Sequence, residues 1–380
     1  MRERATARNA GFKCMKLGGE EEKSRNSIWR RRTYLVISVS VVCILGLLYI
    51  INFIFGLVPL FWDDPGSTAS LEWTLPGQAK TDITSHLLDI TRDVTPIPCH
   101  SHNDYWRRVP LYDALRWGCT GVEADVWLFD KELFVGHSTN ALTKDRTFRT
   151  MYVDPIVRML DLKNTNTSIA TSTSSKNGIF DTVPSQTLVL LVDFKNDGRD
   201  IFPYVSQHLE ALREKNYLTY FDGKTTHGRA VTVVATGNAP FDMINANSTY
   251  RDIFFDAPLA SMPDSDSTSI QARGGGQGTV GTLPNSHFDS TNSYYASVDF
   301  RRAIGFVWWG TLSSKQLALV RGQIKGAHQR GLKARYWSTP KWPIGLRNRV
   351  WRLLVDEGVD YLNGDDLRGM TSLEWGERGL

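Results

Sequence analysis

The segment Gly121-Val-Glu-Ala-Asp-Val126 decides how the rest of this sequence is interpreted. Its apolar residues alternate with Glu123 and Asp125, which is the pattern of a strand, so both carboxylates project from the same face. Two neighbouring acids on a half-apolar strand repel each other and lose hydration, and they stay ionised only beside a positive charge. A divalent cation with oxygen ligands is the simplest such charge. The segment therefore predicts a metal site on a strand.

Two histidines lie on either side of these acids. His102 comes 21 residues before Glu123, in His100-Ser-His-Asn-Asp-Tyr105, and His137 comes 12 residues after Asp125, in Val135-Gly-His137. Both lie where a strand passes into a loop, and imidazole is the side chain best suited to proton transfer near neutral pH. The alternative is that each histidine is structural and that the acids form an exposed, salt-bridged edge. Found together within 38 residues, the four side chains favour a site of acid and base catalysis.

Strand-like and helix-like segments alternate from residue 95 onwards. The run Thr187-Leu-Val-Leu-Leu-Val-Asp193 is continuously apolar, as expected of a strand buried on both faces of a parallel sheet. Together the pattern predicts a (β/α)₈ TIM barrel, with a doubly wound open sheet as the alternative. The predicted strands are 96–101, 121–129, 187–193, 230–236, 252–256, 295–300, 332–337 and 359–363, with a short strand 132–136. The predicted helices are 110–117, 152–162, 200–215, 240–246, 313–330 and 344–357.

A barrel of this kind carries its functional side chains where the strands end. His102, Glu123, Asp125 and His137 would then face the same mouth as Asp193, which ends the third strand, and Lys195 two residues later. Trp337 ends the seventh strand, where it could be a core aromatic or a substrate contact. Lys195 could be an exposed charge at a strand end or a group that faces the substrate, and for both residues we keep substrate binding as the hypothesis.

Charge and composition divide the chain into regions. The net charge is +4, but residues 1–33 hold ten of the 44 Lys and Arg and four of the 40 Asp and Glu. The remaining 34 basic and 36 acidic residues nearly cancel, so nucleic-acid binding is not expected. The predicted regions are a basic tail 1–33, a membrane span 34–60, a linker 61–94 and a barrel 95–370 with low-complexity inserts at 163–186 and 261–293. The sequence gives no oligomeric state.

Tyr34–Leu60 is apolar over 27 residues, and a helix of that length extends about 40 Å, enough to cross a bilayer. A cleaved signal peptide is the less favoured alternative, because the apolar run is longer than such peptides need. Arg30, Arg31 and Arg32 precede the span, so the tail is expected in the cytosol and the barrel in a lumen or outside the cell. Cys99 and Cys119 could pair there, but we expect two buried thiols at opposite ends of a strand-helix unit.

The motifs around these residues resemble a known superfamily. His-Asn-Asp-Tyr at residue 102, Pro-Leu-x-Asp-Ala-Leu at 110, Val-Glu-Ala-Asp-Val-x-Leu at 122 and Leu-x-Val-x-His at 133 are similar to phospholipase C-like phosphodiesterases. This superfamily includes glycerophosphodiester phosphodiesterases and sphingomyelinase D. The nearest pattern is that of the fungal altered inheritance of mitochondria protein 6 family, and the resemblance runs from about Pro96 to Gly369.

The resemblance implies roles for individual residues. His102 and His137 would be the acid/base pair, and Glu123, Asp125 and Asp193 would bind a divalent cation, magnesium or calcium, of which Mg²⁺ is the expected one. Asp193-Phe-Lys195 is similar to the Asp-Leu-Lys of sphingomyelinase D, whose lysine faces the phosphate. The chain would then be a membrane-anchored, metal-dependent phosphoric diester hydrolase acting on a phospholipid or a glycerophosphodiester.

Some positions depart from that pattern. Glycerophosphodiesterases typically have His-Arg-Gly at the first histidine and His-Asp at the second, whereas this chain has His102-Asn103-Asp104 and His137-Ser138. The substrate class therefore stays open, and His100 competes with His102 as the first histidine. Two other functions remain: a membrane-anchored binding protein whose site has lost its catalytic activity, and a glycoside hydrolase that uses Glu123 and a second acid.

Overall fold

The computed structural model describes residues 29–55, 57, 90–165, 176–262, 279–307 and 310–375. The chain forms two compact units, residues 1–64 and 65–380, and each is described by itself. The linker and the central parts of both predicted inserts lie largely outside the described residues.

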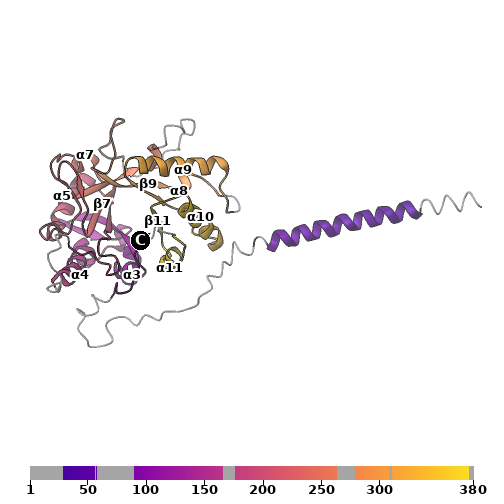
Figure 1. Ribbon diagram of the computed structural model, residues 1–380, viewed down its shortest axis with the longest axis horizontal. Helices are drawn as coiled ribbons and strands as arrows, with labels where there is room; N and C mark the ends of the chain where they lie inside the picture. Colours follow the sequence, from indigo (N-terminus) through magenta and orange to yellow (C-terminus); the bar gives the residue numbers. More distant parts are fainter. Residues whose placement is uncertain are drawn as a thin grey trace, which may run out of the picture. The chain divides into compact units, whose positions relative to one another are not determined.

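Among the described residues of the first unit, Trp29–Phe55 form a helix (Figure 1). All 27 of its residues are exposed, and it is long and apolar enough to cross a membrane. It includes most of the predicted span, whose last residues, 58–60, lie outside the described part of the chain.

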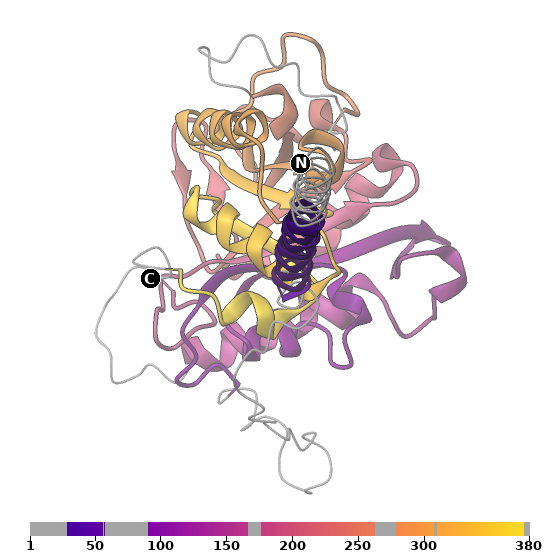
Figure 2. The same ribbon diagram turned by 90° about the vertical axis from the view of Figure 1, so that its right-hand side faces the viewer.

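The second unit is a closed barrel of eight parallel strands among the described residues (Figures 1 and 2). The sheet order is β1-β11-β10-β9-β8-β7-β4-β2, and β1 also pairs with β2, which closes the ring. The predicted TIM barrel is thereby confirmed, and an open sheet is excluded. The strands are β1 Ile97–Ser101, β2 Cys119–Phe129, β4 Leu188–Phe194, β7 Val231–Gly237, β8 Ile253–Pro258, β9 Ser293–Asp299, β10 Lys333–Trp337 and β11 Tyr361–Gly364.

Helices surround the strands. The α-helices are α3 Tyr112–Arg116, α4 Asp154–Thr165, α5 Gly198–His208, α6 Glu210–Arg213, α7 Phe241–Ile244, α8 Phe300–Ala303, α9 Ser314–Gln329, α10 Ile344–Asp356 and α11 Leu367–Thr371. Shorter helical turns are η1 Asp104–Trp106, η2 Thr139–Ala141, η3 Arg149–Val153 and η4 Leu259–Ser261. Two hairpins are added, one by β3 Glu132–Val135 on β2 and one by β5 Tyr220–Phe221 with β6 Thr226–His227.

Most elements lie near the predicted ranges, with differences in two helices. The predicted helix 200–215 is divided at Leu209 into α5 and α6, and α7 is a single turn. The long α9 forms as expected because Ser313 and Gln316 make a reciprocal capping box at its start. Its face with Val320, Ile324 and Ala327 is buried against the barrel.

The barrel has two cores. The larger one lies between strands and helices, and a smaller one fills the inside of the barrel with Val189, Leu191, Val234, Tyr295 and Tyr361. Above this inner core the filling becomes polar. The buried Arg335 guanidinium donates to Ser297 at 2.9 Å and Asn363 at 2.7 Å, and it forms an ion pair with buried Asp256 at 3.2 Å. The C-terminal ends of the strands therefore lie above a layer of polar side chains.

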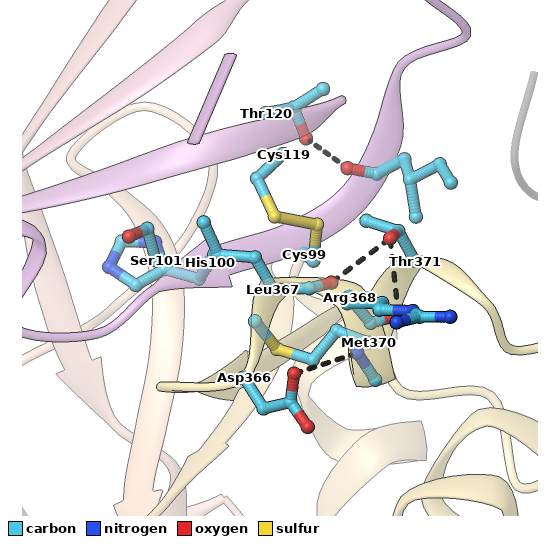
Figure 3. Close-up of a disulfide and its surroundings, with 12 residues drawn as sticks. Cys99, His100, Ser101, Cys119, Thr120, Asp366, Leu367, Arg368, Met370 and Thr371 are labelled. Carbon is cyan, nitrogen blue, oxygen red and sulfur yellow. Dashed lines mark hydrogen bonds between the residues drawn. A yellow bond between two sulfur atoms is a disulfide. The ribbon is translucent and has the colours of Figure 1, made fainter. Parts of the chain in front are cut away.

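Cys99 and Cys119 form a disulfide, so the expectation of two free thiols was wrong. Their Cα atoms are 4.8 Å apart because β1 and β2 are adjacent parallel strands, which brings the two cysteines together in the fold. The expectation had placed them at opposite ends of a strand-helix unit. Figure 3 shows the disulfide close to Leu367 and Met370 of α11. Next to it, the Thr120 hydroxyl donates a hydrogen bond to the Ile97 carbonyl oxygen.

We predict that replacing both Cys99 and Cys119 with alanine lowers the free energy of unfolding by about 3 kcal/mol, since the bond closes a loop of roughly 20 residues in the unfolded chain. Urea unfolding of the chain in detergent measures this difference. Cys43→Ala is the control, because Cys43 is a free, exposed cysteine in the first unit. Equal midpoints for the double variant and the unsubstituted chain would show that the bond adds nothing.

Candidate active site

Three carboxylates meet at the mouth of the barrel. In the pairing of β2 with β4, Asp125 is opposite Asp193, and Glu123 lies two residues earlier on the same face of β2. Oxygens of the three side chains lie within 4.8 Å of one another, and all three residues are buried. Gly237 of β7 makes room for them, because a Cβ atom at that position would lie 1.9 Å from Asp193 Oδ1.

Lys195 partly neutralises this group. Its Nζ lies 2.7 Å from Asp193 Oδ2 and 2.9 Å from Asp125 Oδ2. Burial acts to lower the pKa of Lys195, but the charges of Asp193 and Asp125 outweigh it and raise the pKa, so the ammonium stays charged. The sequence predicted Lys195 as a substrate contact; in the structure it also bridges two of the three acids.

One lysine does not satisfy three buried carboxylates. Burial, together with repulsion from Glu123 and Asp193, raises the pKa of Asp125, and burial also raises that of Asp193. Asp125 Oδ1 is buried and has no hydrogen-bond partner among the described residues. The group therefore lacks sufficient positive charge and has an unpaired carboxylate oxygen. A hard divalent cation would supply the charge and bind that oxygen, so the three carboxylates fit such an ion.

His102 is held by Asp365, for which the sequence analysis assigned no role. β1 and β11 are neighbours with His100 opposite Asn363, so the residues two positions later also meet. His102 Nδ1 lies 2.6 Å from Asp365 Oδ1, and Lys341 lies 2.6 Å from the other oxygen of that carboxylate. Burial acts to lower the pKa of His102, but the hydrogen bond to Asp365 and the charge of Glu123 outweigh it and raise the pKa. Nδ1 is engaged, which leaves Nε2 for chemistry.

His137 reaches the same mouth from the end of β3. Its Nδ1 lies 3.1 Å from the Tyr105 hydroxyl, which is also 2.6 Å from Asp125 Oδ2. The Trp106 ring lies 4.7 Å from the imidazole. Partial burial and the positive charge of Lys195 lower the pKa of His137, opposite to the shift of His102. Tyr105 was not predicted as a site residue; only its place in the His-Asn-Asp-Tyr motif could have indicated it.

His100, the competing first histidine, is fully buried below the mouth. Its Nδ1 lies 3.3 Å from the Tyr295 hydroxyl, and its Nε2 lies 3.9 Å from Glu123 Oε2. Gly121 leaves space for the ring, since a Cβ atom there would be 2.4 Å from His100 Nδ1. Burial lowers the pKa of His100 well below its usual value, so this ring is neutral. Of the two histidines, His102 is the one at the mouth.

Trp337 lines a cavity of about 320 Å³ that opens beside His102 at the ends of β10 and β11. Lys341, Arg347 and Trp351 form other parts of its wall, and the Trp337 Nε1 has no hydrogen-bond partner among the residues described. A larger hollow of about 930 Å³ lies at the opposite end of the barrel, where it is lined by residues at the starts of strands, such as Pro98, Thr120 and Lys333. None of the predicted site residues lines that hollow, so the smaller cavity is the one that belongs to the mouth.

The structure thus brings together all the predicted site residues, Glu123, Asp125, Asp193, Lys195, His102, His137 and Trp337, at one end of one barrel. The chain is also similar to known proteins. Residues 88–256 match the AIM6-like phosphodiesterase domain. The matched region includes every predicted site residue except Trp337.

Relatives match over most of their length. The altered inheritance of mitochondria protein 6 homolog of Arthroderma benhamiae is 37% identical over 298 residues, which are 76% of this chain and 87% of the relative. Altered inheritance of mitochondria protein 6 of Eremothecium gossypii is 35% identical over 303 residues, 78% and 73% of the two chains. The Saccharomyces cerevisiae protein of the same name is 33% identical over 308 residues, 77% and 74%. With its phosphodiesterase-like barrel and these matches, the chain belongs to the altered inheritance of mitochondria protein 6 family.

Proposed function

We propose that this protein is a membrane-anchored, metal-dependent phosphoric diester hydrolase that acts on a phospholipid or a glycerophosphodiester. The observation that carries the proposal is the cluster of Glu123, Asp125 and Asp193 with Lys195, flanked by His102 and His137. The match to a phosphodiesterase domain supports the same reaction class.

A phosphodiester is an anion, so a nucleophile reaches phosphorus only when positive charge offsets the phosphoryl oxygens. A cation held by Glu123, Asp125 and Asp193 would supply most of that charge. Lys195 adds a second positive group next to it. One histidine takes the proton of the attacking oxygen, and the other protonates the departing alkoxide. Either water or a neighbouring hydroxyl of the substrate can be the nucleophile.

Three carboxylates also favour Mg²⁺ over Ca²⁺. Mg²⁺ is commonly bound by a few carboxylates and keeps water or phosphate oxygens at its other positions, whereas Ca²⁺ takes six to eight protein and water oxygens. The group at the mouth offers three close carboxylates in a compact, buried setting. This leaves coordination positions for a phosphate.

The expected orientation places the tail in the cytosol and the barrel in a lumen or outside the cell. Arg30, Arg31 and Arg32 lie at the N-terminal end of the apolar helix, which supports that direction. The Cys99–Cys119 disulfide adds support, because such bonds persist in oxidising compartments. A membrane anchor raises the local concentration of lipid, which favours a lipid substrate.

A binding protein without turnover is the second candidate, because Asn103 and Ser138 replace residues typical of active glycerophosphodiesterases. A glycoside hydrolase is disfavoured. Its two carboxylates act as acid and as nucleophile or base, whereas here Lys195 bridges two of the acids and the two histidines would have no role.

The direct test measures product release by the purified chain from lipid and water-soluble phosphodiesters, with Mg²⁺, Ca²⁺ or chelator. We expect turnover that requires the metal. His102→Ala should abolish turnover and leave metal affinity largely intact, because this side chain is not among the three acids. Metal binding without turnover on any diester would favour the binding protein, and equal loss of both properties in His102→Ala would make that histidine structural.

Asp193→Asn should weaken metal binding about tenfold or more. Loss of a group that only orients a metal ligand already lowers metal affinity about 10–100-fold, and loss of a ligand should cost at least as much. The metal-free variant should not be less stable than the unsubstituted chain, because one of three mutually repelling buried carboxylates is gone. Calorimetric titration gives the affinity and thermal unfolding gives the stability. Asp200→Asn, an exposed change of the same charge, is the matched control. Unchanged affinity would remove Asp193 from the ligand set.

Asp365→Asn should lower the pKa of His102, because it removes the carboxylate whose hydrogen bond and charge help to raise that pKa. The limb of the pH–rate profile that reports His102 should move to lower pH by about one unit. If that limb is the alkaline one, His102 is the acid; if it is the acidic one, His102 is the base. The exposed Asp356→Asn serves as the control. A profile that does not move would show that Asp365 does not set the protonation of His102.

A further inference from the structure

Large exposed apolar side chains gather on one side of the barrel mouth. Trp106 is 59% exposed, Phe306 75% and Trp342 68%, and Ile344 is also exposed. They lie in segments that follow β1, β9 and β10. These strands and β11 are consecutive in the sheet, so the four residues occupy one continuous sector of the mouth, called here the apolar rim.

The apolar rim adjoins the candidate active site. The Trp106 ring lies 4.7 Å from His137. Lys341, the residue before Trp342, pairs with Asp365, which in turn holds His102. A surface that contacts the rim therefore lies next to the site.

The charges of the rim differ from those on the other side of the mouth. Arg108, Arg301, Arg302 and Lys341 are exposed among or beside the rim residues. The segments that follow β4 and β7 instead expose Asp197, Arg199, Asp200 and Asp242, and the one large apolar side chain exposed among the described residues there is Tyr250, at 38%. The rim thus combines aromatic and aliphatic side chains with cations.

We propose that the apolar rim docks on a phospholipid bilayer that contains anionic lipids. Single aromatic side chains on separate loops, flanked by Arg and Lys, are suited to the interface between head groups and acyl chains. The cations are complementary to anionic head groups. The chain has its own candidate membrane helix, so a bilayer is the apolar surface always within its reach.

Covalent geometry allows this contact. Between Phe55 and Ile90 lie 34 residues, and a chain of that length can extend over at most about 120 Å. The length of this segment is compatible with the proposed contact. Docked in this way, it would receive substrate from the lipid surface; only this last step rests on the proposed diester hydrolase activity.

The test uses the full chain with Cys14→Ser and Cys43→Ser, so that one new cysteine carries an environment-sensitive fluorophore. The label is placed at Phe306→Cys, or at Gln329→Cys as the matched control, since Gln329 is exposed at the end of α9 at the opposite end of the barrel. Each chain is inserted as a single copy into nanodiscs of phosphatidylcholine and phosphatidylglycerol. Emission is then recorded with and without lipids brominated on their acyl chains.

We expect a blue shift and quenching by brominated lipid at position 306 but not at 329, and weaker quenching after Arg301→Gln with Arg302→Gln. Absence of quenching at 306, or equal quenching at both positions, would overturn the proposal. A blue shift at 306 that needs a second copy of the chain and no lipid would overturn it in favour of self-association. The fluorescence signal does not depend on turnover. Quenching at position 306 without diester hydrolysis would therefore support the docking surface and contradict only the proposed hydrolase activity.

Discussion

The constraint on which this structure depends is the repulsion among three carboxylates buried at the mouth of a closed barrel. Glu123, Asp125 and Asp193 are held together by the register of β2 against β4, and Lys195 offsets only part of their charge. Such a group is unfavourable for stability, since burial penalises each ionised carboxylate. This unsatisfied group fits the divalent cation that we propose for the site, and such a cation would in turn attract an anionic substrate.

The rest of the mouth is arranged around that group. Tyr105 connects Asp125 to His137, and Asp365 connects Lys341 to His102, so each histidine is oriented through Nδ1 by a different partner. The pKa values of the two imidazoles consequently shift in opposite directions. Two titratable groups driven apart in this way are suited to opposite proton transfers. Beneath them, the buried Arg335 guanidinium binds Asn363 and Asp256 and forms a polar layer above the apolar inner core.

The same end of the barrel carries the apolar rim, so chemistry and the proposed membrane contact coincide on one face. Strand order accounts for this coincidence. The loops that follow parallel strands all open at one end, and β9, β10, β11 and β1 are adjacent in the ring. Exposed side chains from segments about 200 residues apart, such as Trp106 and Phe306, therefore share one sector of the mouth.

The sequence by itself predicted the barrel and placed most of the candidate site residues at one end of it. Alternating apolar runs predicted the strands, and the two-residue spacing of Glu123 and Asp125 placed both on one face, because these signals are local. Tertiary structure alone decided the partners that come from distant segments. Asp365 reaches His102 across 263 positions only because β11 closes the ring onto β1, and the Cys99–Cys119 bond depends on β1 and β2 lying side by side. Closure and register are long-range properties, and no spacing within one strand encodes them.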